Sequence, residues 1–176
     1  MKYKEALKMS MENLAKDEKV FFLGYNVARG SRAYGTLSDI SEERCIETPV
    51  AENLMAGLAM GLSLEGFHPV LYFERHDFIL NALDALVNHL DKTCDLSHME
   101  FNMPVIVRAA VGGTFPIYPG LQHTQDFTKT LKEIMKCTEV HDLKTPGEIL
   151  SAYENFKKFD KQVILIEHKD LYETEE

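Results

Sequence analysis

Glu52 is a carboxylate near the start of the apolar, small-residue stretch IETPVAENLMAGLAMGLSLEG (46–66). A carboxylate held away from water has a raised pKa and can share or donate a proton. The alternative is structural, because an acidic residue in the first turn of a helix interacts favourably with the helix dipole. The residue types alone leave both interpretations open.

His123 could transfer a proton, and Arg75 could bind an anion. His123 follows the glycine- and proline-rich segment 112–122, which is typical of a loop. A histidine titrates near neutral pH and can donate or accept a proton, although a loop histidine can equally be an inert surface residue. Arg75 suits an anionic substrate group, or it pairs with Glu74 or Asp77.

The elements that must position these residues alternate between strands and helices. Because the strands are apolar without clear alternation, they predict a mostly parallel sheet covered on both faces, a three-layer α/β/α sandwich. Ligands of such sheets bind at the carboxyl ends of the strands. The predicted strands are 20–25, 44–48, 68–73, 104–110, 138–142 and 162–168, and the predicted helices are 2–17, 50–65, 77–92, 125–135 and 145–159.

Composition excludes several classes of protein. The chain has 176 residues and a net charge of −9, which argues against a nucleic-acid surface. Its three cysteines and seven histidines show no spacing typical of a metal site or a disulfide framework. The charged amino-terminal segment is no signal peptide, and the longest apolar run, Leu54 to Leu64, is too short to span a membrane. We therefore expect a cytoplasmic protein with no membrane contact.

Five segments in order resemble the pyrimidine-binding domain of thiamine-diphosphate enzymes. They are ETPVAENLMAGLAMGLSLEGFHPVLYF, DFILNALDALVNHLDK, MPVIVRAAVGG, QHTQ and VILIEHKDLY. The chain is most similar to the beta subunit of the 2-oxo acid dehydrogenase decarboxylase component and more distantly to transketolase. The resemblance implies a pyrimidine-binding domain over 1–172, followed by an acidic tail, 173–176.

The resemblance also assigns the catalytic and cofactor-binding residues. It implies that Glu52 hydrogen-bonds a ring nitrogen of the aminopyrimidine and favours the tautomer that removes the proton from the thiazolium carbon C2. Phe73 and His76 match positions near the pyrimidine, where His76 replaces the usual stacking Phe or Tyr and adds a titratable group or signals a changed substrate. Asn26 is assigned to the cofactor site, and His123 matches a histidine on the substrate side.

Arg75 and Gln122 complete the candidate set as substrate-binding residues. Two departures from the family qualify the assignment. Tyr25 and Asn26 stand where the beta subunits usually carry an acidic pair, so coupling between paired active sites is in doubt. The sequence also contains no Gly-Asp-Gly, the mark of the family's diphosphate and Mg²⁺ site.

The sequence therefore predicts one subunit of a split thiamine-diphosphate enzyme, active on a 2-oxo acid with an alpha-type partner that binds the diphosphate and Mg²⁺. This chain itself would hold no metal. A homodimer or hetero-oligomer is expected, with the active site between chains. The alternatives are a transketolase-like or carboligase component with a ketose substrate, and a non-catalytic regulatory relative.

Overall fold

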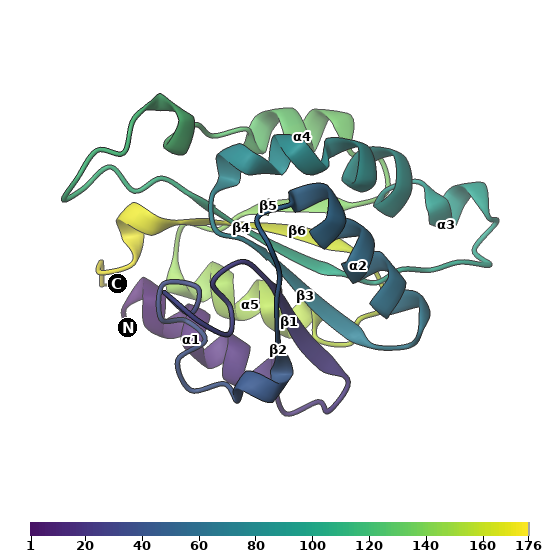
Figure 1. The fold of residues 1–176 in the computed structure, drawn as a ribbon, viewed down its shortest axis with the longest axis horizontal. Helices are drawn as coiled ribbons and strands as arrows, with labels where there is room; N and C mark the ends of the chain where they lie inside the picture. Colours follow the sequence, from purple (N-terminus) through teal and green to yellow (C-terminus); the bar gives the residue numbers. More distant parts are fainter. Residues whose placement is uncertain (176) are drawn as a thin grey trace.

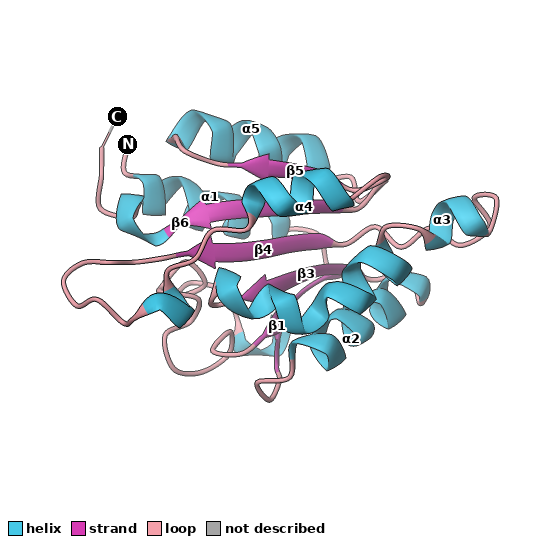
Figure 2. Cartoon of the chain, turned by 90° about the horizontal axis from the view of Figure 1, so that it is seen from above, coloured by secondary structure: helices cyan, strands magenta, loops and turns pink. Residues whose placement is uncertain are grey.

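The computed structural model describes residues 1–175 and contains a six-stranded sheet with the order β2-β1-β3-β4-β6-β5 (Figures 1 and 2). Every neighbouring pair in it is parallel, which confirms the predicted α/β fold. The strands are β1 (Val20–Gly24), β2 (Cys45–Glu47), β3 (His68–Phe73), β4 (Ile106–Val111), β5 (Glu139–Asp142) and β6 (Val163–His168).

Helices cover both faces of this sheet and form the two outer layers (Figure 2). One face carries α1 (Tyr3–Leu14) and α5 (Pro146–Phe156). The other face carries α2 (Glu52–Leu64), a 3₁₀ helix (His76–Ala82), a π-helix (Asp84–Leu90) and α4 (Thr128–Ile134). The short α3 (Thr93–Leu96) lies at the far end from the carboxyl edge of the strands. Three further 3₁₀ turns are Glu42–Arg44, Leu121–His123 and Lys169–Leu171.

The central strands are buried on both faces, as an apolar run without alternation predicts. In β6, for example, residues 163–166 are all inaccessible to solvent. Each fully buried aliphatic side chain contributes about 1.5–3 kcal/mol relative to an exposed one. Because the sheet is buried on both faces, it is rigid. It therefore holds in place the loops that leave the carboxyl ends of its strands.

Two predicted helices differ from the observed ones. The helix expected over 77–92 is a 3₁₀ helix followed by a π-helix, which ends with the Asp91 amide donating to the Leu86 carbonyl oxygen at 2.9 Å. The helix expected over 125–135 begins only at Thr128. There the Gln125 amide donates to the Asp77 carboxylate at 3.0 Å, and this long-range bond keeps the first residues out of the helix.

The carboxyl-terminal residues contact the amino terminus. Glu173 pairs with Lys2 at 3.0 Å, and the Tyr3 amide donates to the Thr174 carbonyl oxygen at 3.1 Å. The expected tail is thus solvent-exposed but also hydrogen-bonded over 173–175, while Glu176 lies outside the described residues. The boundary at 172 stays a prediction. Among residues 1–175, no helix has the length and apolar character needed to cross a membrane.

Candidate active site

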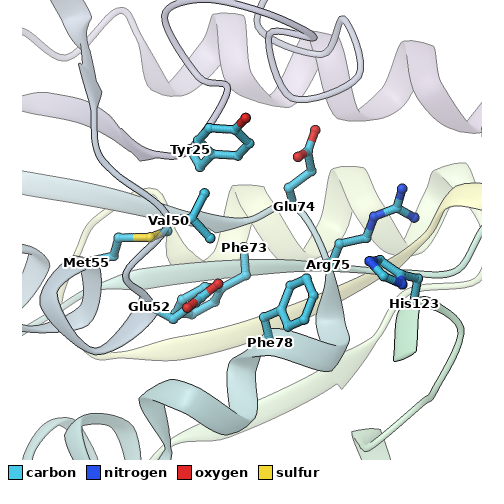
Figure 3. A pocket seen from close by; sticks show the side chains of 9 residues that line it. All are labelled: Tyr25, Val50, Glu52, Met55, Phe73, Glu74, Arg75, Phe78 and His123. Atoms are coloured by element: carbon cyan, nitrogen blue, oxygen red, sulfur yellow. The ribbon is translucent and has the colours of Figure 1, made fainter. Parts of the chain in front are cut away.

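A hollow of about 220 Å³ lies at the carboxyl ends of β1, β2 and β3 (Figure 3). This is the edge where a parallel sheet binds its ligands. The loops that follow these strands and the start of α2 supply its walls. The lining residues are Tyr25, Val50, Glu52, Met55, Phe73, Glu74, Arg75, Phe78 and His123.

Glu52 is the first residue of α2 and is 8% exposed. The Asn81 side-chain amide donates to its Oε2 at 3.2 Å. Strand β2 ends at Glu47, and the short connection through Pro49 turns the chain so that α2 starts at the hollow. A nearly buried carboxylate in a cavity is suited to hydrogen bonding and proton exchange with a bound ligand. Glu52 therefore lies where the sequence predicted.

Aromatic and aliphatic side chains form the floor around Glu52. Phe73, the last residue of β3, is 1% exposed, and Met55 follows Glu52 by one turn of α2 and is 2% exposed. Phe78 reaches the hollow from the 3₁₀ helix (Figure 3). A flat apolar ligand would be desolvated between these residues, while Glu52 would remain available for a polar contact.

His123 closes the hollow from the loop after β4. Its ring meets Phe78 edge to face, with ring centroids 5.4 Å apart. Its Nδ1 is buried and has no hydrogen-bond partner within residues 1–175. A buried nitrogen without a partner is costly, so a ligand that supplies one would be favoured here.

Arg75 lines the same end as His123 (Figure 3). Its Nη1 donates to the Gly112 carbonyl oxygen at 3.1 Å, which ties the side chain to the start of the 112–121 loop. Within residues 1–175, Arg75 forms no ion pair with Glu74 or Asp77, which accept hydrogen bonds from Asn26 and Gln125 instead. The remaining guanidinium donors make Arg75 the cationic group of the hollow.

Three predicted site residues do not line the hollow. His76 is fully buried, its Nε2 accepts the Phe127 amide at 3.0 Å, and its ring stacks on Phe127 rather than facing the cavity. Asn26 turns its amide onto Glu74, with Nδ2 to Oε2 at 3.0 Å. Gln122 is exposed on the 3₁₀ turn beside His123. Phe78, two residues later, lines the hollow, whereas His76 does not.

Sequence reasoning missed Phe78 and Met55 as lining residues. Tyr25, Val50 and Glu74 lie at or just after the ends of predicted strands, where ligands were expected, but no role in the site was assigned to them. For Phe78 a signal was available, because this aromatic residue lies only five residues after β3 ends at the carboxyl edge. Glu74 follows Phe73 and had the same signal. For Met55 the only signal was its closeness to Glu52 in the sequence.

No group of three or more histidine, cysteine, aspartate or glutamate side chains among residues 1–175 is arranged to hold a metal ion. The hollow combines two carboxylates, one unpartnered imidazole nitrogen, one guanidinium and five apolar or aromatic side chains. That set of groups suits a flat heteroaromatic ring with polar edges better than it suits a cation.

The comparison with protein families agrees with this geometry. The family model "Transketolase, pyrimidine binding domain" matches residues 1–175. This chain belongs to that family. The resemblance seen in the sequence is thereby confirmed, and with it the assignment to a transketolase-like pyrimidine-binding domain.

Named relatives extend the likeness. The "Pyruvate dehydrogenase E1 component subunit beta" of Rickettsia conorii is 30% identical over 96% of this chain and 52% of its own length. The "2-oxoisovalerate dehydrogenase subunit beta" of Bacillus subtilis is 29% identical over 98% of this chain and 53% of its own. The chain thus spans about half the length of these relatives. A solved "Split gene transketolase, inactive beta4 tetramer" shares the fold, with a TM-score of 0.73 at 16% identity over 99% of this chain and 51% of that one.

Proposed function

We propose that this chain binds the aminopyrimidine half of thiamine diphosphate and supplies the activating glutamate of an enzyme that decarboxylates a 2-oxo acid. The observation that carries the proposal is Glu52, a nearly buried carboxylate at the carboxyl edge of the sheet, inside a hollow with aromatic walls. Membership of the pyrimidine-binding family and the named beta-subunit relatives support the same assignment.

Glu52 would hold the pyrimidine through a hydrogen bond to a ring nitrogen. The Asn81 amide, which donates to Oε2 at 3.2 Å, orients the carboxylate and leaves Oε1 for the ligand. Phe73 and Phe78 would pack against the ring and exclude water, which strengthens the hydrogen bond. When bound, thiamine diphosphate supplies a nucleophilic carbon that attacks the substrate carbonyl.

His123 and Arg75 would act on the substrate side. His123 has a buried nitrogen without a protein partner, so it can hold or move a proton at a substrate oxygen. Arg75 can bind the carboxylate of a 2-oxo acid while its Nη1 stays on the Gly112 carbonyl oxygen. Gln122 is exposed and would contact substrate only from the entrance. Asn26 and His76 would support the site from behind the lining residues rather than touch the cofactor.

A partner would provide the diphosphate and Mg²⁺ site. Mg²⁺ requires several oxygen ligands in octahedral geometry, and these 176 residues contain no Gly-Asp-Gly. The outer face of α2 suits a protein contact, because Leu54 is 57% exposed and a Cβ placed on Gly57 or Gly61 would meet nothing within 4 Å. We propose an alpha-type partner chain against this face in a hetero-oligomer, and a homodimer of this chain is the alternative assembly. A cytoplasmic location stays a prediction.

The test is the Glu52→Gln variant, assayed with the diphosphate-binding chain that co-purifies with this one. Glutamine keeps the shape of the side chain but cannot exchange the proton, and losing a general acid–base group costs about 10²- to 10⁴-fold in rate. The matched control is Glu65→Gln, an exposed carboxylate at the other end of α2. We expect turnover to fall in the first variant only, with unchanged circular dichroism in both.

Near-normal turnover by Glu52→Gln would make the carboxylate structural and would refute the proposed mechanism. Wild-type complex that fails to exchange the C2 proton of thiamine diphosphate would instead indicate the non-catalytic relative. A complex that exchanges the C2 proton and turns over a ketose, but not a 2-oxo acid, would indicate the transketolase-like alternative.

A further inference from the structure

Glu47 is the last residue of β2, and its carboxylate accepts hydrogen bonds from four consecutive backbone amides of the turn after β1. The Asn26 amide donates to its Oε1 at 2.6 Å, and the amides of Val27, Ala28 and Arg29 donate to its Oε2 at 3.0, 2.8 and 3.3 Å. Successive amides that converge on one point form an anion-binding nest. Here the anion is a side chain of the same protein.

The turn that Glu47 holds is tight and has an unusual backbone. Asn26 adopts a positive φ of 58°, and Gly30 has a φ of 61°. A Cβ on Gly30 would lie 2.1 Å from the Asn26 Oδ1, so the Asn26 side chain packs directly over this glycine. A left-handed conformation of a non-glycine residue costs free energy and persists only when its surroundings enforce it. The four hydrogen bonds to Glu47 provide that enforcement.

The same turn builds one wall of the candidate active site. Tyr25 directly precedes the four amides, and its side chain lines the hollow (Figure 3). Asn26 Nδ2 donates to both carboxylate oxygens of Glu74, at 3.1 and 3.0 Å, and the Ser31 hydroxyl donates to Oε1 at 3.0 Å. Glu74 also lines the hollow. Tyr25 therefore belongs to the turn that Glu47 hydrogen-bonds, and Glu74 accepts hydrogen bonds from that turn.

We propose that Glu47 is a positioning residue, whose carboxylate holds the 25–31 turn so that Tyr25 and Glu74 form one wall of the hollow. Glu47 itself is exposed and does not line the hollow. Its effect therefore reaches the site through the backbone. The catalytic consequence rests on the proposed function, whereas the positional claim stands on the geometry of this chain alone.

Two substitutions separate this role from simple bulk stability. In Glu47→Gln one carboxylate oxygen becomes an NH₂ group, which would face either the Asn26 amide or the other three, donor against donor. Glu47→Asp keeps the charge and both acceptors but shortens the side chain by one methylene group, so it restores part of the nest. Glu43→Gln is the matched control, since this exposed carboxylate lies in the turn just before β2.

The first measurement uses the 176-residue chain alone, by nuclear magnetic resonance below the unfolding transition. In Glu47→Gln we expect shifted amide signals for residues 26–29 together with shifted Tyr25 ring signals, while the amides of β4 and β6 stay in place. Glu47→Asp should give smaller shifts and Glu43→Gln none in this region. Shifts confined to the four amides, with the Tyr25 ring signals unchanged, would overturn the proposal. If Glu47→Gln does not fold, Glu47→Asp answers the same question.

The second measurement is turnover in the complex with the partner chain. A misplacement of about 1 Å in a site wall can cost about 10²-fold in rate, so we expect a loss of that order in Glu47→Gln, partial rescue in Glu47→Asp and full activity in Glu43→Gln. Equal activity in all three would contradict a positioning role. If the wild-type complex shows no activity, the proposed function fails, and the resonance shifts still decide whether Glu47 organises the wall.

Discussion

At the scale of single residues, the buried His76 links the segment after β3 to the segment before α4. His76 is fully buried, and its Nε2 accepts the Phe127 amide at 3.0 Å, which fixes the proton on Nδ1. Burial lowers the pKa of His76 below its usual value, although Asp126 and Asp77 oppose the shift. The imidazole therefore stays neutral in the folded protein, where it anchors the segment leading to α4.

This burial makes stability depend on pH. In the unfolded chain His76 titrates near about 6.5, whereas in the folded chain its pKa is lower. As the pH falls below about 6.5, the unfolded state binds a proton that the folded state resists, so stability is lost over that window. His76→Gln keeps an acceptor but removes the titration, and we expect a flatter dependence of the unfolding midpoint between pH 8 and 5.

The control is His98→Gln, since His98 is exposed in the segment after α3. It should keep the wild-type slope of stability against pH. Identical slopes for wild type and His76→Gln would show that His76 does not resist protonation in the folded state.

At the scale of elements, sequence signals predicted those features that hydrogen bonds between residues close in the sequence stabilise. The helix predicted over 145–159 begins with Thr145 and Pro146, residue types typical of a helix start. The structure shows a capping box there: the Glu148 amide donates to Thr145 Oγ1 at 3.1 Å, and the Thr145 amide donates to Glu148 Oε2 at 3.0 Å. By contrast, the π-helix and the late start of α4 depend on bonds between distant segments, such as Gln125 to Asp77. A pattern within one segment carries no such information.

The same distinction explains the candidate site. Glu52 and His123 were predicted because a strand end or a loop places them at the carboxyl edge. The orientation of His76 was not predicted, because it depends on a hydrogen bond from Phe127, which lies some fifty residues later in the sequence. Which of two nearby aromatic positions faces a cavity is decided by such packing across the fold.

Removing the cap of α5 should weaken the whole domain. Thr145→Ala leaves the Glu148 amide without its acceptor, and the loss of such a cap costs about 0.5–2 kcal/mol. Chemical denaturation should show a lower free energy of unfolding. Thr130→Ala, an exposed position inside α4, is the control and should change stability little. A Thr145→Ala variant as stable as the wild type would mean that water replaces the cap without cost.

At the scale of the whole molecule, exposed apolar side chains surround the hollow. Val50 is 60% exposed and Leu54 57%, and across the hollow the 112–121 loop exposes Phe115, Ile117 and Leu121 to 85%, 78% and 76%. This loop projects beyond the sheet in Figure 1. Apolar surface of this kind around a cavity is typical of a protein contact. It agrees with the proposal that a second chain completes the site.

Calorimetry of this chain with thiamine diphosphate and Mg²⁺, alone and with its co-purifying partner, tests the central claim most directly. A pyrimidine ring offers few atoms for binding, and the diphosphate needs Mg²⁺ with its own oxygen ligands. We predict no micromolar binding by the chain alone and micromolar binding once the partner is present, weakened or abolished by Glu52→Gln. Micromolar binding by the chain alone would contradict the account, because it would show that these 176 residues hold a complete cofactor site.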